Sequence, residues 1–251
     1  MTSGFETIIY HKDYNVAQII LNRPRVLNAH NMQMRDDIYA ALEAAQDDPD
    51  IRCIILRGEG ERAFCTGADL TEFGTAPSRV IARQVRWERD LWGLFLSIDK
   101  PIVAAIHGYV LGSGMEMAML CDLRIGSDDA VFGMPELALG MIPVAGGTQI
   151  IPRAVGAPRA LDMLLRNKHI DSAKALEIGL VHRVVPRDIL LRESLALAKR
   201  LVDCPVYLLN SMKEAMHRGL DMSLAQALEL ELRLASSVMS IRIKNKVMTD
   251  N

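Results

Sequence analysis

Two acidic residues lie in surroundings that are unusual for charged side chains. Glu116 and Glu136 are twenty residues apart, and each sits in an apolar stretch beside a glycine-bearing loop. A carboxylate is rarely buried alone, and burial raises its pKa toward neutrality, where the group can take or give a proton near pH 7. Two such acids could act on both sides of one substrate. The alternative is that both lie at helix starts, where the helix dipole favours a negative charge without catalysis, and the spacing alone does not decide between the two.

Two glycine-bearing loops, residues 63–70 and 108–114, precede helical patterns. Backbone N–H groups at the start of a helix lack partners and carry partial positive charge, so each loop can offer a donor to an anionic oxygen. Two such donors would form an oxyanion hole. Gly112 and Gly114 do not belong to a dinucleotide-binding fingerprint, because Met117 takes the place of its third glycine.

The composition excludes several classes of protein. A chain of 251 residues that is 50% hydrophobic and 24% charged predicts a globular α/β protein with a substantial core. A net charge of −2 gives no general attraction for nucleic acid or anionic membranes. No apolar run is long enough to span a bilayer and residues 1–6 do not resemble a secretory signal, so we expect a cytoplasmic protein. The spacing of the cysteines and histidines predicts no metal site.

Apolar periodicity predicts how the chain is organised. Up to about residue 150, strands and helices alternate, with strands expected at residues 7–10, 16–21, 51–56, 102–106, 123–125 and 130–132, and helices at residues 31–46 and 78–98. Helical patterns then dominate, at residues 148–155, 158–166, 172–177 and from the strand at 180–185 to the end. This order predicts an α/β core, residues 1–195, carrying a helical region, residues 196–251, that buries its apolar faces on a neighbour or another subunit.

Three arginines, Arg79, Arg83 and Arg86, share one face of the helix expected at residues 78–98. A solvated helix face is the simpler interpretation, because a short basic stripe in an acidic protein is weak evidence for anion binding. A noncatalytic RNA-binding protein is the alternative from another class, although such binding usually needs a larger basic footprint. Trp87 and Trp92 are expected to pack rather than to stack on a ligand.

Five motifs occur in order between about residues 8 and 216. They are Asn22-Arg23-Pro24 with Leu27-Asn28-Ala29, Ala63-Phe64 with Gly67-Ala68-Asp69-Leu70, His107-Gly108 with Gly112-Ser113-Gly114-Met115-Glu116, Met134-Pro135-Glu136 with Gly140, and Pro143 with Gly146-Gly147-Thr148. Together they resemble the crotonase, or enoyl-CoA hydratase, superfamily. The resemblance implies a crotonase-like spiral of ββα turns with a helical C-terminal oligomerisation region, usually assembled as a trimer or a dimer of trimers.

The resemblance also implies substrates and site residues. The substrates would be acyl-CoA thioesters, with the thioester oxygen held by the backbone N–H groups of Ala68 and Ser113. Glu116 would deprotonate water for attack at the β carbon, and Glu136 would deliver a proton to the α carbon. The residues implied in substrate and CoA binding are Arg25, Ala68, Asp69, Leu70, Thr71, Ser113 and Val144. No metal or redox cofactor is implied, because the polarised thioester activates its own carbons and coenzyme A is part of the substrate.

Having both glutamates favours an enoyl-CoA hydratase, since isomerases and hydrolases of the superfamily commonly keep one or neither. Isomerisation of the double bond, dehydration of a hydroxyacyl-CoA and hydrolysis of an acyl-CoA are the alternative reactions.

Some positions depart from the superfamily pattern. Ser113 and Val144 stand where glycine is common, and Met134 stands where a polar residue is common, so a reshaped acyl pocket and a more apolar setting for Glu136 are expected. A lysine that often meets a CoA phosphate is absent after Leu70, and Arg25 could serve instead. The residues from Ser236 to Asn251 lack the usual closing pattern, which puts CoA contacts from that tail in doubt.

Overall fold

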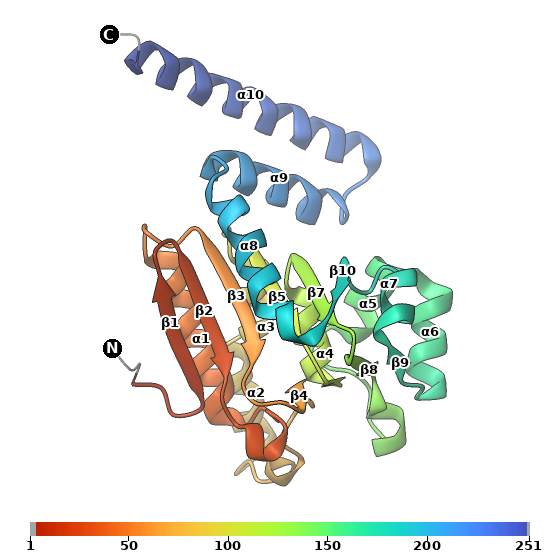
Figure 1. The fold of residues 1–251 in the computed structure, drawn as a ribbon. Coiled ribbons are helices and arrows are strands. Elements are labelled where there is room, and N and C mark those ends of the chain that lie inside the picture. The colour runs from red at the N-terminus through yellow and green to blue at the C-terminus, as the bar shows by residue number, and fades with distance from the viewer. Residues whose placement is uncertain (1–3, 250–251) are drawn as a thin grey trace.

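A six-stranded sheet runs through the body of the protein (Figure 1). The computed structural model describes the backbone of residues 4–249 and the side chains of residues 4–241, so the end of the atypical tail lies outside the described side chains. In spatial order the strands are β1 (Ile8–Asp13), β2 (Val16–Leu21), β3 (Cys53–Gly58), β5 (Ile102–Ile106), β7 (Leu123–Ser127) and β10 (Arg183–Val185). The first two form an antiparallel hairpin, and the remaining neighbours are parallel.

A smaller sheet repeats the order of the large one. Its strands are β4 (Ala63–Cys65), β6 (Tyr109–Leu111), β8 (Val131–Gly133) and β9 (Ile170–Asp171). Each of β4, β6 and β8 follows a strand of the large sheet in the chain and precedes a helical segment, so the same ββα turn recurs three times. The expected spiral of ββα turns is confirmed, and it stacks the loops after β4, β6 and β8 beside one another because these strands pair in parallel.

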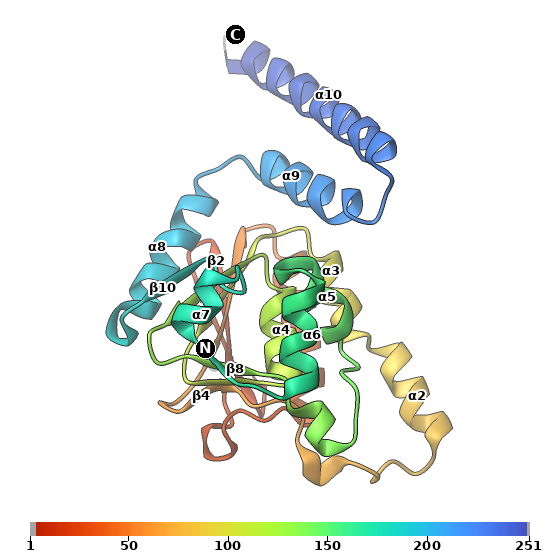
Figure 2. The ribbon, with the colours of Figure 1, turned by 90° about the vertical axis from the view of Figure 1, so that its right-hand side faces the viewer.

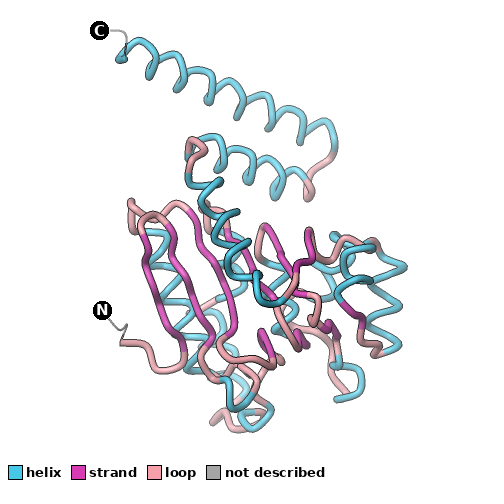
Figure 3. The backbone as a smooth tube through the Cα atoms, in the orientation of Figure 1, coloured by secondary structure: helices cyan, strands magenta, loops and turns pink. Residues whose placement is uncertain are grey.

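Helices cover both faces of the large sheet (Figure 3). Ile54, Leu56 and Ala104 face one layer, and the alternate residues Cys53 and Ile55 face α8 on the other, as the two-residue period of a strand requires. The α-helices are α1 (Met32–Asp47), α2 (Arg79–Glu88), α3 (Leu91–Ser97), α4 (Ser113–Leu120), α5 (Gly147–Val155), α6 (Ala157–Arg166), α7 (Ser172–Glu177), α8 (Leu190–Val202), α9 (Val206–Gly219) and α10 (Leu224–Thr249). Among the described residues, four 3₁₀ turns each lie between a strand and an α-helix: η1 (Pro24–Val26), η2 (Leu70–Glu72), η3 (Pro135–Leu139) and η4 (Arg187–Ile189).

The single helix predicted at residues 78–98 is wrong. Two helices, α2 and α3, occupy this stretch, because Asp90 leaves helical geometry and its side chain accepts a hydrogen bond from Gly93 N at 3.1 Å to start α3. No residue of α2 is buried, and Figure 2 shows the helix extending away from the body. The interpretation of Trp87 as a packing residue is wrong as well, since its side chain is 68% exposed and lies beneath the guanidinium of Arg83.

The C-terminal helices form an arm above the body (Figure 1). Helix α10 packs chiefly against α9, and Leu224, Leu228 and Leu232 lie exposed along it at intervals of four residues. The expected boundary between residues 195 and 196 falls inside α8, which packs on the large sheet, and the division into two parts stays a prediction. Among the residues that the structure describes, no helix is long and apolar enough to cross a membrane.

Helix α4 lies at the centre of the fold and is almost wholly buried. Seven of its eight residues are buried, and its second residue, Gly114, touches the backbone of β4. A β-carbon at Gly114 would lie 2.3 Å from Cys65 O, a distance that real contacts do not reach. The absence of a side chain therefore lets the start of α4 approach β4, which precedes the loop containing Ala68.

Gly114→Ala is expected to lower the free energy of unfolding by about 1–3 kcal/mol, because backbone atoms must shift to admit the methyl group. Gly126→Ala is the matched control: Gly126 is also buried, but its β-carbon would meet its nearest neighbour at an ordinary 3.7 Å. Urea unfolding of both variants measures the difference. Equal stability of the two would contradict the tight packing of α4 on β4.

Candidate active site

Glu116 is a buried carboxylate held by backbone amides. It lies in the first turn of α4, is 1% exposed, and its Oε1 accepts hydrogen bonds from Ala145 N at 3.1 Å and Gly147 N at 2.5 Å. Burial raises the pKa of Glu116, the two N–H groups oppose that rise, and the charge of Glu136 adds to it. Glu116 is thus kept in the core, and the two hydrogen bonds to its Oε1 fix the position of the carboxylate.

Two glycines bring these amides to the carboxylate. Gly146 has a φ of +110°, which favours glycine, and it turns the chain into α5. At Gly147 a β-carbon would lie 2.9 Å from Glu116 Oε1 and 2.8 Å from the methyl carbon of Met134, so only glycine leaves room for the contact. Ala145 and Gly147 were not predicted from the sequence as partners of the acid, although the paired glycines of the fifth motif were the available signal.

Glu136 is held differently. It lies in η3 and is half-buried, and its Oε2 is buried with no hydrogen-bond partner among the described residues. Burial raises its pKa, which its own backbone N–H partly offsets. Its Oε1 would lie 2.8 Å from a β-carbon at Gly112, whose φ of +53° also favours glycine. Glu136 therefore reaches the loop that leads into α4, and its charge acts on Glu116.

The two predicted oxyanion donors belong to loops that touch. A β-carbon on Gly67, beside Ala68, would lie 3.4 Å from Ser113 N, so glycine keeps the space in front of that amide open. Neither Ala68 N nor Ser113 N donates to another residue in the described part of the chain. Ser113 begins α4 as expected, whereas the loop containing Ala68 leads first into the 3₁₀ turn η2 and only then into α2.

Three of the predicted binding residues lie in or beside the loop after β4. Asp69 forms an ion pair with Arg23 at 2.9 Å and accepts a hydrogen bond from the Thr71 hydroxyl at 2.7 Å, and these contacts lower the pKa of Asp69. Both side chains therefore stabilise the loop itself. Leu70 is 54% exposed beside them.

The other two predicted binding residues lie on different elements. Arg25 is exposed in η1, and no hydrogen bond or ion pair of its side chain is found within the described residues. Val144 is 62% exposed, and its carbonyl oxygen accepts a hydrogen bond from Arg86 of α2. The guanidinium of Arg86 also lowers the pKa of Glu116, so α2 contributes a positive charge near the acid pair.

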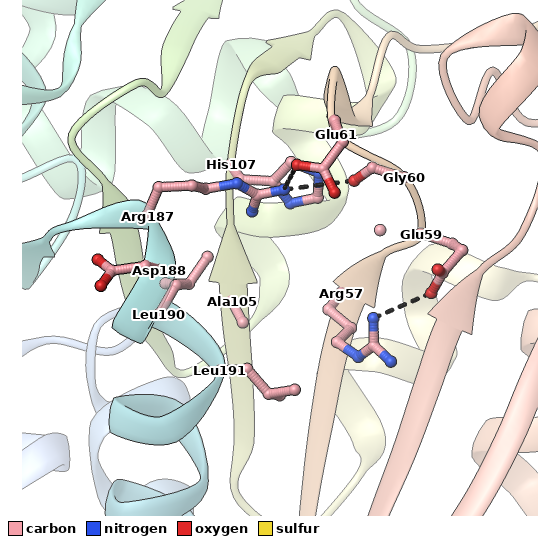
Figure 4. Close-up of a pocket in the computed structure, with 11 residues that line it drawn as sticks. Arg57, Glu59, Gly60, Glu61, Ala105, His107, Arg187, Asp188, Leu190 and Leu191 are labelled. Atoms are coloured by element: carbon pink, nitrogen blue, oxygen red, sulfur yellow. Dashed lines mark hydrogen bonds and ion pairs between the residues drawn. The ribbon is translucent and has the colours of Figure 1, made fainter.

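A polar hollow elsewhere on the protein contains none of the predicted site residues. Figure 4 shows Arg57 paired with Glu59, and Arg187 directed toward Gly60 and Glu61, around the ring of His107. Burial and the nearby Arg187 lower the pKa of His107 to about 4. The hollow has a volume of about 210 Å³, below the range of roughly 300–1,000 Å³ of most ligand sites. This hollow is therefore a weaker candidate for the active site than the acid pair with its amides.

Comparisons with known proteins show which family the chain resembles. The model of the enoyl-CoA hydratase/isomerase family matches residues 11–249. The chain is 38% identical over 247 residues to the probable enoyl-CoA hydratase echA8 of Mycobacterium tuberculosis, covering 97% of this chain and 94% of that protein. It is 35% identical over 229 residues to the crotonyl-CoA hydratase of Syntrophomonas wolfei, covering 91% and 88%.

Solved structures of similar proteins share the fold. Enoyl-CoA hydratase subunit I of Geobacillus kaustophilus matches with a TM-score of 0.90 and 35% identity, covering 98% of this chain and 95% of that chain. DspI of Pseudomonas aeruginosa matches with a TM-score of 0.87 and 28% identity, covering 94% and 91%. On its sequence motifs, its spiral of ββα turns and these matches, the chain belongs to the enoyl-CoA hydratase/isomerase family.

Proposed function

We propose that this protein is an enoyl-CoA hydratase that adds water across the 2,3 double bond of an acyl-CoA thioester. The observation that carries the proposal is the pair of acids, Glu116 buried and Glu136 half-buried, whose pKa values are both raised by burial. Relatives named as enoyl-CoA and crotonyl-CoA hydratases support the same reaction. No metal or redox cofactor enters the proposal, because a thioester with a polarised carbonyl activates its own α and β carbons.

The different hydrogen bonds of the two acids suggest a different role for each in proton transfer. Glu116 accepts two backbone N–H bonds, which favour its charged form and suit it to take a proton from water as that water attacks the β carbon. Glu136 has a buried oxygen without a partner in the described chain, which suits it to carry a proton and give it to the α carbon. The water oxygen forms a bond to the β carbon and keeps one hydrogen as a hydroxyl group, while the 2,3 double bond becomes a single bond. Glu116 takes the other hydrogen as a proton, Glu136 gives its own proton to the α carbon, and passage of the proton from Glu116 to Glu136 restores the pair.

The backbone amides of Ala68 and Ser113 would hold the negative charge that develops on the thioester oxygen. Both N–H groups lack acceptors among the described residues, and their loops are in contact. Removing one donor from such a site costs on the order of 3 kcal/mol of transition-state stabilisation.

We further propose that Arg25, Leu70 and Val144 contact the CoA or acyl part of the substrate, while Asp69 and Thr71 shape the loop. The cytoplasmic location expected from the sequence stays a prediction.

Glu116→Ala and Glu136→Ala are each expected to lower turnover of a short-chain enoyl-CoA by about 10² or more, because each removes a proton-transfer group. Loss of the conjugated absorbance of the substrate measures turnover. Glu177→Ala, which removes an exposed acid of α7, is the matched control and should retain activity. Turnover unchanged in either site variant would rule out the paired-acid mechanism.

A reaction in labelled water separates hydration from isomerisation. Hydration places the labelled oxygen in the product, and isomerisation of the double bond does not.

Glu116→Gln is expected to gain stability relative to the native protein as the pH rises. Burial raises the pKa of Glu116, so the stability that its proton supplies is present below the unfolded pKa of about 4.5 and is lost as the pH rises through the folded value. The amide does not titrate, and its oxygen can still accept from Ala145 and Gly147. Urea unfolding at pH 5 and pH 8 tests this, with Glu177→Gln as control. If Glu116→Gln and the native protein differ in free energy of unfolding by the same amount at pH 5 and pH 8, the raised pKa of Glu116 is contradicted.

We also propose that the chain assembles as a trimer or a dimer of trimers through its C-terminal arm. Leu224, Leu228 and Leu232 are 75%, 55% and 68% exposed on α10, and one apolar stripe of this length is usually buried on another subunit. Light scattering after size-exclusion chromatography should give a trimer or hexamer for the native chain and smaller species for Leu228→Asp with Leu232→Asp. A native monomer at micromolar concentration would refute the assembly.

A further inference from the structure

His30 connects the two loops that carry the candidate oxyanion donors. Its Nε2 lies 2.7 Å from Ser113 Oγ, although the two residues are 83 positions apart in the chain. Its backbone pairs with the other loop: His30 N donates to Gly67 O at 2.8 Å, and Asp69 N donates to His30 O at 2.9 Å. The residue between these two contacts is Ala68. One residue therefore binds the Ala68 loop through its main chain and the Ser113 loop through its ring.

We propose that His30 is a positioning residue that sets the separation and direction of the Ala68 and Ser113 amides. This inference rests on the proposed function, in which those amides hold the thioester oxygen. An oxyanion hole acts only if its donors are fixed before the reaction, so a brace between its two halves affects the transition state more than the binding of substrate.

The surroundings of His30 keep its ring in place and uncharged. The ring packs edge-on against Trp92 of α3, with 6.0 Å between ring centroids. Burial, with smaller contributions from Arg35 and Arg23, lowers the pKa of His30 to about 4, and Asp69 only partly opposes this. Near neutral pH the ring is therefore uncharged. It forms one hydrogen bond with the Ser113 hydroxyl and places no full charge beside the thioester.

The hydroxyl of Ser113 links the start of α4 to His30. At the first residue of α4, the side chain and the N–H of Ser113 share one Cα, so the hydrogen bond to Oγ restrains the position of the residue that carries the amide. A β-carbon at Gly67 would lie 3.6 Å from Oγ, so the glycine leaves open space on that side, and the contact that fixes the hydroxyl is the one with His30 Nε2. His30 and Ser113 should therefore act as a unit.

The test compares His30→Leu, Ser113→Ala and the double variant with His30→Gln, whose amide nitrogen can take the place of Nε2. We expect His30→Leu and Ser113→Ala each to lower kcat about tenfold with KM within about twofold, the double variant to be no worse than either single one, and His30→Gln to recover much of the loss. His11→Leu removes an exposed histidine of β1 and is the matched control. Urea unfolding of each variant verifies that it is folded under the assay conditions.

A readout independent of hydration is the absorption of bound cinnamoyl-CoA, which moves to longer wavelength as its carbonyl is polarised. The native protein should produce this shift, and His30→Leu should bind the probe with a smaller shift. A full shift in His30→Leu would overturn the proposal, as would additive losses of kcat in the double variant. A native protein that shifts the probe but hydrates no enoyl-CoA would refute the proposed function and leave the role of His30 standing. A native protein that binds the probe without a shift would refute both.

Discussion

The candidate site depends on backbone amides that reach a carboxylate inside the core. Glu116 is 1% exposed, and an unpaired carboxylate at that depth would be strongly destabilising. Two N–H groups, one from the loop before α5 and one from the first residue of α5, supply its hydrogen bonds without supplying a counter-charge. The acid is thereby kept buried and fixed but not neutralised, and its pKa stays raised. A salt bridge at the same place would have lowered that pKa and removed the group from proton transfer near neutral pH.

The recurring ββα turn explains why these groups meet. Because β4, β6 and β8 are parallel neighbours, the segments that follow them lie side by side: the Ala68 loop, the start of α4 with Ser113, and η3 with Glu136. Glycines at the crossings remove the side chains that would keep the backbones apart, as at Gly112, where a β-carbon would meet the Glu136 carboxylate. The site is thus assembled from the same position in successive turns of one spiral, and its precision follows from sheet pairing.

Much of this could be predicted from local patterns. The strands β2 and β5 and the helix α7 have the predicted bounds, because apolar periodicity over five or six residues reflects burial directly. The break at Asp90 was missed because a cap inside an otherwise helical pattern depends on one side-chain hydrogen bond. The contact of His30 with Ser113 and the amides of Ala145 and Gly147 were also missed. Such contacts join distant segments, and a backbone N–H has the same chemistry at every residue except proline, so sequence alone does not mark it.

The central claim is that two amides and two acids act on one thioester. A crystal structure with an unreactive acyl-CoA analogue tests it most directly. The account predicts the thioester oxygen at about 3 Å from both Ala68 N and Ser113 N, as hydrogen bonding requires, with the α and β carbons between the carboxyl groups of Glu116 and Glu136. A thioester bound elsewhere, or one whose carbonyl points away from both amides, would contradict it.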